Sequence, residues 1–256
     1  MEDWSARQYL KFEDERTRPP RDLLAQVPLR APRRVVDVGC GPGNSTALLA
    51  ERFAHAEVVG LDASPDMLRK ARERLPQLSF LKADIAAWSP EPGTDLLFSN
   101  AVMQWLPDHT TVLRRLLEAL APGGVLAVQM PDNTREPALV FQAEVGRQGP
   151  WADLPQIKAA ARPDLPSVEE YYDLLKPVCS HIDIWHSVYN HVMASPQAIV
   201  EWFKGSSLQP FLSPLDAVAR EKFLAAYGAK IKSAYKPRRD GNVLLKFPRL
   251  FIVAVR

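Results

Sequence analysis

The chain has 256 residues, of which 46% are hydrophobic and 24% charged, which excludes disordered, collagen-like and disulfide-scaffold proteins and favours one α/β domain with insertions. The net charge of +2 argues against a nucleic-acid partner, no apolar run is long enough to span a membrane, and the acidic start argues against a signal peptide. Two cysteines, Cys40 and Cys179, suit a reducing compartment and lack zinc-ligand spacing, so we expect a cytoplasmic protein without a metal. No feature of the sequence indicates an obligate protein partner.

Residues 33–130 alternate short, β-branched apolar runs with segments of helical periodicity. Strands that alternate with helices imply right-handed βαβ crossovers and a parallel sheet buried on both faces. The expected strands lie at residues 35–39, 57–62, 78–84, 95–100 and 125–130. The expected helices lie at residues 44–53, 64–75 and 108–120.

Local signals mark the ends of these helices. Ser64 before Pro65 is typical of an N-cap hydroxyl followed by proline at the first helical position, and Asp108 is suited to cap the next helix. The run Pro122-Gly123-Gly124 is expected to end that helix.

The alternation stops after Met130. Four prolines lie within residues 150–166, from Pro150 to Pro166, and they disfavour a long helix or strand there. Because this stretch is longer than an ordinary loop, it indicates a lid or an insertion. Strand patterns return at residues 183–192 and 249–255, and two helical stretches separate them at residues 195–206 and 214–235.

A glycine-rich loop joins the first expected strand to its helix. Gly39, Gly41 and Gly43 permit a tight turn and the close approach of a ligand, and the helix N-terminus favours an electron-rich partner. A dinucleotide fingerprint would place a third glycine where Asn44 stands, and a Walker A loop would need a lysine that is absent. Pyrophosphate and triphosphate ligands are therefore disfavoured.

Acidic and amide residues lie at the ends of the expected strands, before and after this loop. Asp37 precedes the loop by two residues, Asp62 and Asp84 end the second and third strands, and Asn100 ends the fourth. With the loop, they make residues 33–130 resemble the class I S-adenosylmethionine-dependent methyltransferases. The resemblance implies a Rossmann-like, doubly wound, mainly parallel seven-stranded sheet with an antiparallel C-terminal strand. It also implies S-adenosylmethionine as cofactor, bound by Asp37, Gly39, Gly41, Gly43, Asp62, Asp84 and Asn100.

A closer similarity covers nearly the whole chain. It includes Trp4, the run from Gln104-Trp105 to His109, Asp183-Ile-Trp185 and the run from Phe247-Pro to Arg249. These residues make the chain similar to the family members that methylate a carboxylate of trans-aconitate, with a monomethyl ester as product. We therefore expect one domain over residues 1–256, with an N-terminal cover segment at 1–32 and insertions at 134–168 and 195–242 that cap the acceptor site.

A carboxylate acceptor determines which side chains are needed. The acid is already ionised at pH 7, so no general base is required and no catalytic residue is assigned. A tricarboxylate calls for arginine forks and for Tyr, Gln or His donors near the strand ends or in the covering segments. The candidates are Tyr9, Arg16, Arg18, Gln104, Trp105, His109 and Arg249.

Each candidate also fits a structural role. Asp37 is suited to accept hydrogen bonds from the loop's own N–H groups, and Asp62 and Asp84 are suited to cap turns. Two other functions stay open, a class I enzyme for a different small acid and a non-catalytic S-adenosylmethionine-binding protein. The structural roles for the acceptor candidates are core packing for Trp105, a helix first turn for His109, and solvated surface charge for Arg16 and Arg18.

Overall fold

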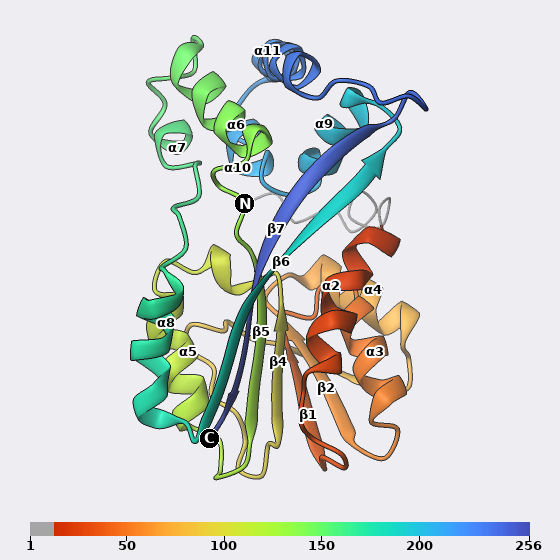
Figure 1. The fold of residues 1–256 in the computed structure, drawn as a ribbon, viewed down its shortest axis with the longest axis vertical. Helices are drawn as coiled ribbons and strands as arrows, with labels where there is room; N and C mark the ends of the chain where they lie inside the picture. The colour runs from red at the N-terminus through yellow and green to blue at the C-terminus, as the bar shows by residue number, and fades with distance from the viewer. Residues whose placement is uncertain (1–12) are drawn as a thin grey trace.

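Seven strands form one sheet in the order β3-β2-β1-β4-β5-β7-β6, with helices on both faces (Figure 1). The computed structural model describes residues 13–256, with side chains described from Thr17 onward. The first five strands are parallel, and β7 runs antiparallel between β5 and β6, which confirms the expected sheet. The strands are β1 (Arg34–Val38), β2 (Glu57–Asp62), β3 (Ser79–Lys82), β4 (Leu96–Asn100), β5 (Val125–Pro131), β6 (His181–Met193) and β7 (Val243–Val255).

Helices cover the sheet in two groups (Figure 1). One group packs against the face where Val35, Val58 and Leu96 are buried, and the other against the face of Val36 and Leu97. None of the described helices is long and apolar enough to cross a lipid bilayer. The first group is α2 (Glu13–Ala25), α3 (Asn44–Arg52) and α4 (Pro65–Arg74), and the second is α5 (His109–Glu118) and α8 (Val168–Leu175).

Two of the three predicted helix ends are confirmed. Ser64 caps α4 by accepting from Met67 N at 3.3 Å, and Pro65 begins the helix. Gly123 adopts a φ of 87° in the turn after α5. Asp108 precedes α5, but its side chain makes no cap hydrogen bond. The expectation for Asp108 was wrong because its backbone, with φ −110° and ψ 41°, departs from the extended conformation of a capping residue.

The strands β6 and β7 extend well beyond the sheet. Residues 249–255 of β7 pair with both β5 and β6, whereas residues 243–248 pair with β6 alone. The two strands therefore form an arm that carries helices away from the sheet (Figure 1). We call these helices, with those between β5 and β6 that pack on them, the helical layer. They are α6 (Pro137–Gln148), α7 (Pro155–Lys158), α9 (Pro196–Lys204), α10 (Gln209–Leu212) and α11 (Ala217–Ala234).

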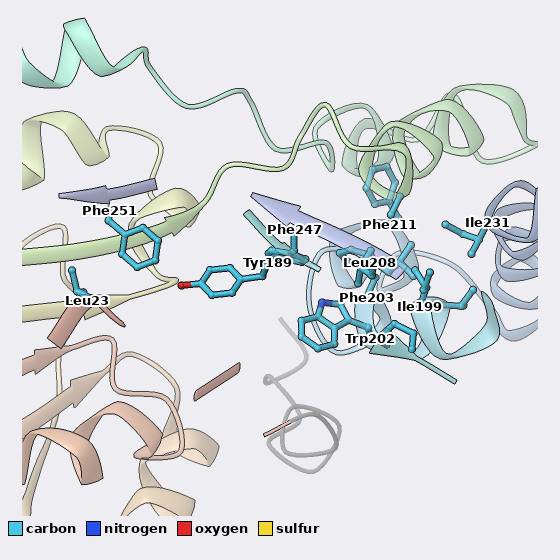
Figure 2. Packing of buried hydrophobic residues seen from close by; sticks show 14 of the residues in the cluster. Leu23, Tyr189, Ile199, Trp202, Phe203, Leu208, Phe211, Ile231, Phe247 and Phe251 are labelled. Carbon is cyan, nitrogen blue, oxygen red and sulfur yellow. The ribbon is translucent and has the colours of Figure 1, made fainter. Parts of the chain in front are cut away.

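One apolar cluster runs from the sheet into the helical layer. Figure 2 shows Leu23 and Phe251 at the sheet, Tyr189 between, and Trp202 and Phe203 among the helices. All five side chains are buried, so the cluster holds the arm and its helices in a fixed place over the sheet.

Candidate active site

A cavity of about 430 Å³ lies between the carboxyl ends of the parallel strands and the helical layer. The glycine loop, the ends of β2, β4 and β5, the loop after α9 and the strand β7 all contribute to its wall. Ligands of open α/β sheets bind at this edge, outside the strand ends. The cavity is therefore the candidate site.

The glycine loop needs glycine for two different reasons. Gly39 and Gly41 have φ values of 79° and 53°, in the left-handed region that side chains rarely adopt. A Cβ on Gly39 would lie 2.3 Å from Cγ2 of Val102, so a side chain there would clash. A Cβ on Gly41 would meet no atom within 4 Å, so this part of the loop leaves open space in the cavity wall.

Asp62 is held at the cavity wall by the backbone of the loop. Gly41 N donates to Oδ2 at 2.9 Å, and Ser64 N donates to Oδ1 at 2.8 Å. These bonds fix the orientation of the carboxylate, which offers about four acceptor sites in all. Asp62 therefore caps a turn, as one alternative expected, and also faces the cavity.

Asp37 lies on β1, fully buried and outside the cavity lining. Ser45 and Thr46 donate their hydroxyls to its Oδ2 at 2.7 and 2.6 Å, so side chains rather than loop N–H groups hold it. Burial raises the pKa of Asp37 to about 6, and the nearby charge of Asp62 acts in the same direction. Its Oδ1 has no hydrogen-bond partner among the described residues, which leaves one acceptor unsatisfied.

The end of β4 turns sharply into the cavity wall. Ala101 follows Asn100 with a φ of 58°, an uncommon conformation for a residue other than glycine. Gln104 holds the turn, since its Nε2 donates to Ala101 O at 2.6 Å. Asn100, Gln104 and the partly exposed Trp105 all line the cavity. Oδ1 of Asn100 and Oε1 of Gln104 are buried and make no hydrogen bond to a described residue.

Two arginines line the cavity near the end of β5. The side chain of Arg249 is buried, donates from Nη1 to Gln129 Oε1 at 3.0 Å, and places its guanidinium 4.5 Å from the ring centre of Phe247. Arg162 donates from Nη2 to Pro131 O at 3.0 Å, and Pro131 is the register partner of Arg249. Both cations are thus anchored around the same strand end.

The charge of the cavity is divided along the sheet. Among the described residues that line it, the charged ones are Asp62, Arg162 and Arg249. Asp62 ends β2, whereas Arg249 lies on β7, which is four strands away in the sheet order. The end beside the glycine loop is therefore acidic, and the other end is basic.

Besides Asp37, two expected cofactor residues lie outside this lining. Gly43 is the N-cap of α3, and a Cβ there would lie 3.2 Å from Leu75, so it faces α4 instead. Asp84 is exposed because β3 ends at Lys82, and its Oδ1 accepts from Ala86 N at 3.0 Å. The capping role considered for Asp84 is therefore what the structure describes.

Of the acceptor candidates that the structure describes, two lie outside this lining. His109 Nε2 is 2.6 Å from the hydroxyl of Tyr171, and burial lowers the pKa of the histidine. Arg18 lies over the ring of Tyr189, at 5.2 Å. Tyr9 falls outside the described residues, and the side chain of Arg16 is likewise not described.

Several lining residues were not expected from the sequence. Arg162 lies in the proline-rich stretch, and the sequence indicated only that this stretch is an insertion. The other residues lie in patterns that are typical of a hydrophobic core or of a loop. They are Asn133, Leu139, Trp202, Phe203, Ser206, Ser207, Pro210 and Phe247.

Comparison with known proteins agrees with this architecture. A family model described as a methyltransferase domain matches residues 35–124. The trans-aconitate 2-methyltransferase of Rhodopseudomonas palustris (strain HaA2) is 59% identical over 256 residues, which is 100% of each chain. The protein of that name from Paracidovorax citrulli (strain AAC00-1) is 55% identical over 258 residues, covering 100% of this chain and 99% of its own.

Solved structures share the fold at low identity. The phosphoethanolamine N-methyltransferase 2 of Haemonchus contortus, in complex with S-adenosyl-L-methionine, has a TM-score of 0.54 at 22% identity and covers 93% of this chain and 52% of that chain. The YcgJ protein of Bacillus subtilis has a TM-score of 0.61 at 15% identity and covers 93% of this chain and 98% of its own.

Proposed function

The chain belongs to the trans-aconitate 2-methyltransferase family, and from this premise we propose that it transfers the methyl group of S-adenosylmethionine to a carboxylate of trans-aconitate. The products are the monomethyl ester and S-adenosylhomocysteine. The observation that supports this most directly is the divided cavity, with Asp62 beside the glycine loop and two anchored arginines at the other end. A neutral or cationic acceptor would bring no negative charge to this basic end of the cavity.

The acidic end of the cavity suits the methyl donor, whose sulfonium supplies an electrophilic methyl group. Asp62 is oriented to accept both ribose hydroxyls, and the open space at Gly41 admits the ligand against the backbone. Asp37 presents an unsatisfied oxygen beneath the loop, where the ammonium group of the methionine moiety would offset its charge. Asn100 completes the proposed donor contacts in the cavity, whereas for Asp84 a contact rests on the family resemblance alone.

The basic end suits an ionised polycarboxylate. Arg249 is proposed to bind one carboxylate of the acid, because its guanidinium is held in place by Gln129 and Phe247. Gln104 and Trp105 form the wall beside the end of β4, where the reacting oxygen must approach the methyl group. For the remaining acceptor candidates, contact with the substrate is supported by the family resemblance alone. They are Tyr9, Arg16, Arg18 and His109.

The chemistry requires orientation more than proton transfer. The described lining contains no histidine, lysine or tyrosine, and burial raises the pKa of Cys40 well above its ordinary value. The acceptor oxygen is already anionic, so alignment with the sulfonium methyl and exclusion of water lower the barrier. A positive donor and a negative acceptor partly cancel in the transition state.

The proposal is tested by incubating the protein with S-adenosylmethionine labelled at the methyl group and a panel of acids. We expect label in a base-labile ester of trans-aconitate, and much less with cis-aconitate, citrate, a fatty acid or an isoprenoid acid. The trimethyl ester of trans-aconitate is the matched control, since it lacks every acceptor carboxylate. Preferred labelling of an apolar acid, or of none, would contradict the proposal.

The site of action is proposed to be the cytoplasm. Cys40 and Cys179 are both free thiols, which suits a reducing compartment.

A further inference from the structure

A second cavity of about 200 Å³ adjoins the first. It lies between α6 and the loop after α7, with Val140, Ala143 and Ala160 in its wall. Both cavities share part of their lining, so they meet there, and we call the shared residues the junction. The junction consists of Trp105, Leu139, Arg162 and Ser207.

Arg162 has an amino group available at the junction. Both of its hydrogen bonds, to Pro131 O at 3.0 Å and to Asn133 Oδ1 at 2.8 Å, use Nη2. Nη1 donates to no described residue and is not among the buried unpartnered atoms, so it is accessible. The two bonds fix the plane of the guanidinium and leave this second arm of the fork to donate.

No described carboxylate forms an ion pair with Arg162. The two nearby acids are engaged elsewhere: Asp132 lies 2.9 Å from His186 Nε2, and Asp164 accepts from Thr134 at 2.5 Å and from Arg135. Burial lowers the pKa of Arg162 to about 10, so the guanidinium remains cationic at neutral pH. A half-buried cation without a paired carboxylate attracts an anionic ligand.

Ser207 faces the junction from the helical layer, between α9 and α10. Its Oγ is buried and has no hydrogen-bond partner among the residues that the structure describes. A buried hydroxyl without a partner is unfavourable, and a small rotation would let it donate to a ligand oxygen. Two donors on separate elements thus lack acceptors at the same junction.

We infer that Arg162 and Ser207 form a subsite for a non-reacting carboxylate of the acceptor. The inference rests on the proposed function and deepens it. Arg249 and Arg162 flank the end of β5, so an acid with several carboxylates contacts both, whereas an acid with fewer carboxylates does not reach Arg162. The subsite therefore selects polycarboxylates over acids with fewer charges.

The test compares three substrates in Arg162→Gln and Arg162→Lys. Steady-state kinetics give kcat/KM for trans-aconitate and for mesaconate and itaconate, which keep its carboxylate at C2 but each lack one of the other two. We expect Arg162→Gln to lower kcat/KM for trans-aconitate about 100-fold, mainly through KM, and that for the dicarboxylate without the bound carboxylate less than about threefold. Arg162→Lys should fall between, and Ser207→Ala should lose about threefold to tenfold.

Controls separate this subsite from a loss of folding or of the reaction itself. Lys158→Gln changes an exposed cation of α7 that lines neither cavity, and should behave as wild type. Affinity for S-adenosylmethionine and the melting temperature should be retained in Arg162→Gln. Equal losses on all three substrates, or normal kinetics with trans-aconitate, would overturn the subsite. Absence of ester formation by the wild-type protein would instead overturn the proposed function.

Discussion

Asp37 and Asp62 show how two carboxylates at one strand edge take different roles. Asp62 is oriented by backbone N–H groups at the cavity wall, whereas Asp37 is buried beneath it with one oxygen unsatisfied. The pKa of Asp37 is raised from 3.8 to about 6, so its ionised form is disfavoured in the folded protein. Stability therefore falls as the pH rises from about 4 to about 6, and the deficit at neutral pH is about 3 kcal/mol.

Because ionisation of Asp37 destabilises the folded protein, Asp37→Asn should be stabilising at neutral pH. The amide removes the buried charge, so the unfolding free energy of the ligand-free protein should rise by about 1–3 kcal/mol at pH 7.5. At pH 4 the wild-type carboxyl is already protonated, and the gain should vanish. Denaturant unfolding at both pH values measures the difference. A gain of equal size at pH 4 and pH 7.5 would show that the charge is not responsible.

Arg249 is expected to contribute to catalysis by binding a carboxylate of the substrate. Loss of its guanidinium in Arg249→Ala should lower kcat/KM for trans-aconitate by about two to three decades, equivalent to about 3–4 kcal/mol. Arg249→Lys keeps the charge but not the planar fork and should fall between alanine and wild type. Affinity for S-adenosylmethionine should barely move.

The Arg249 variants also lose a buried hydrogen bond to Gln129, so stability has to be measured on the same preparations. If the arginine only supports the fold, the melting temperature falls while the folded enzyme keeps its kcat/KM. A folded Arg249→Ala enzyme with normal kinetics would exclude the role in carboxylate binding.

The sequence predicts a place at the cavity for residues that lie at the end of a predicted strand. Asp62 and Asn100 end strands, so their place at the cavity followed once the strands were identified. Arg162 could not be found in this way, because it lies in a proline-flanked loop without periodicity and reaches the cavity only through contacts with Pro131 and Asn133.

In the glycine loop, alanine substitutions at Gly39 and Gly41 should have different effects on stability. Gly39→Ala should destabilise the protein by several kcal/mol, on the order of an overpacked core, because its Cβ would lie 2.3 Å from Val102. Gly41→Ala meets open space, so it should lose only about 1–2 kcal/mol through its positive φ.

The two loop variants should separate folding from binding. Gly41→Ala should remain folded yet bind S-adenosylmethionine more weakly, because the new methyl group occupies the cavity wall. Thermal unfolding and calorimetric titration measure both properties. Equal destabilisation by the two substitutions would contradict the difference in packing, and Val102→Ala should partly restore Gly39→Ala.

Strands and helices differ in how well the sequence predicts them. The strand expected at residues 57–62 is β2 itself, because a short β-branched run between helices leaves little alternative. The helix α2 was not predicted, since Pro19 and Pro20 lie inside it and weigh against a helix. Its buried Leu23 and Leu24 pack against the sheet, which is a tertiary effect that local pattern does not contain.

At the scale of the whole molecule, the site depends on two parts of the fold. The parallel strands supply the donor end of the cavity, and the β6–β7 arm places the helical layer opposite it (Figure 1). The helical stretches at 195–206 and 214–235 could be predicted because they lie between two strand patterns and correspond to α9 and α11, but the sequence did not reveal that the arm extends past the sheet. The pairing of residues 243–248 with β6 alone places Phe247 in the cavity lining.

The cavity as a whole predicts the pH dependence of the reaction. The acceptor carboxylate is already ionised and no general base is invoked, so kcat should be nearly flat between about pH 6.5 and 8.5. Below about pH 6, Asp37 takes up a proton, and the KM for S-adenosylmethionine should rise. Initial rates over this range, with the chemical step shown to limit turnover, provide the measurement. A rise in kcat with a slope of one would imply a general base.

The central claim is that donor and acceptor meet in this cavity, with the acid held by the arginines. A crystal structure with S-adenosylhomocysteine and trans-aconitate tests it most directly. We predict the nucleoside against Asp62 and Gly41, carboxylates on Arg249 and Arg162, and one carboxylate oxygen within about 3–3.5 Å of the position of the transferred methyl carbon. An acid bound elsewhere, or one that contacts neither arginine, would contradict the account.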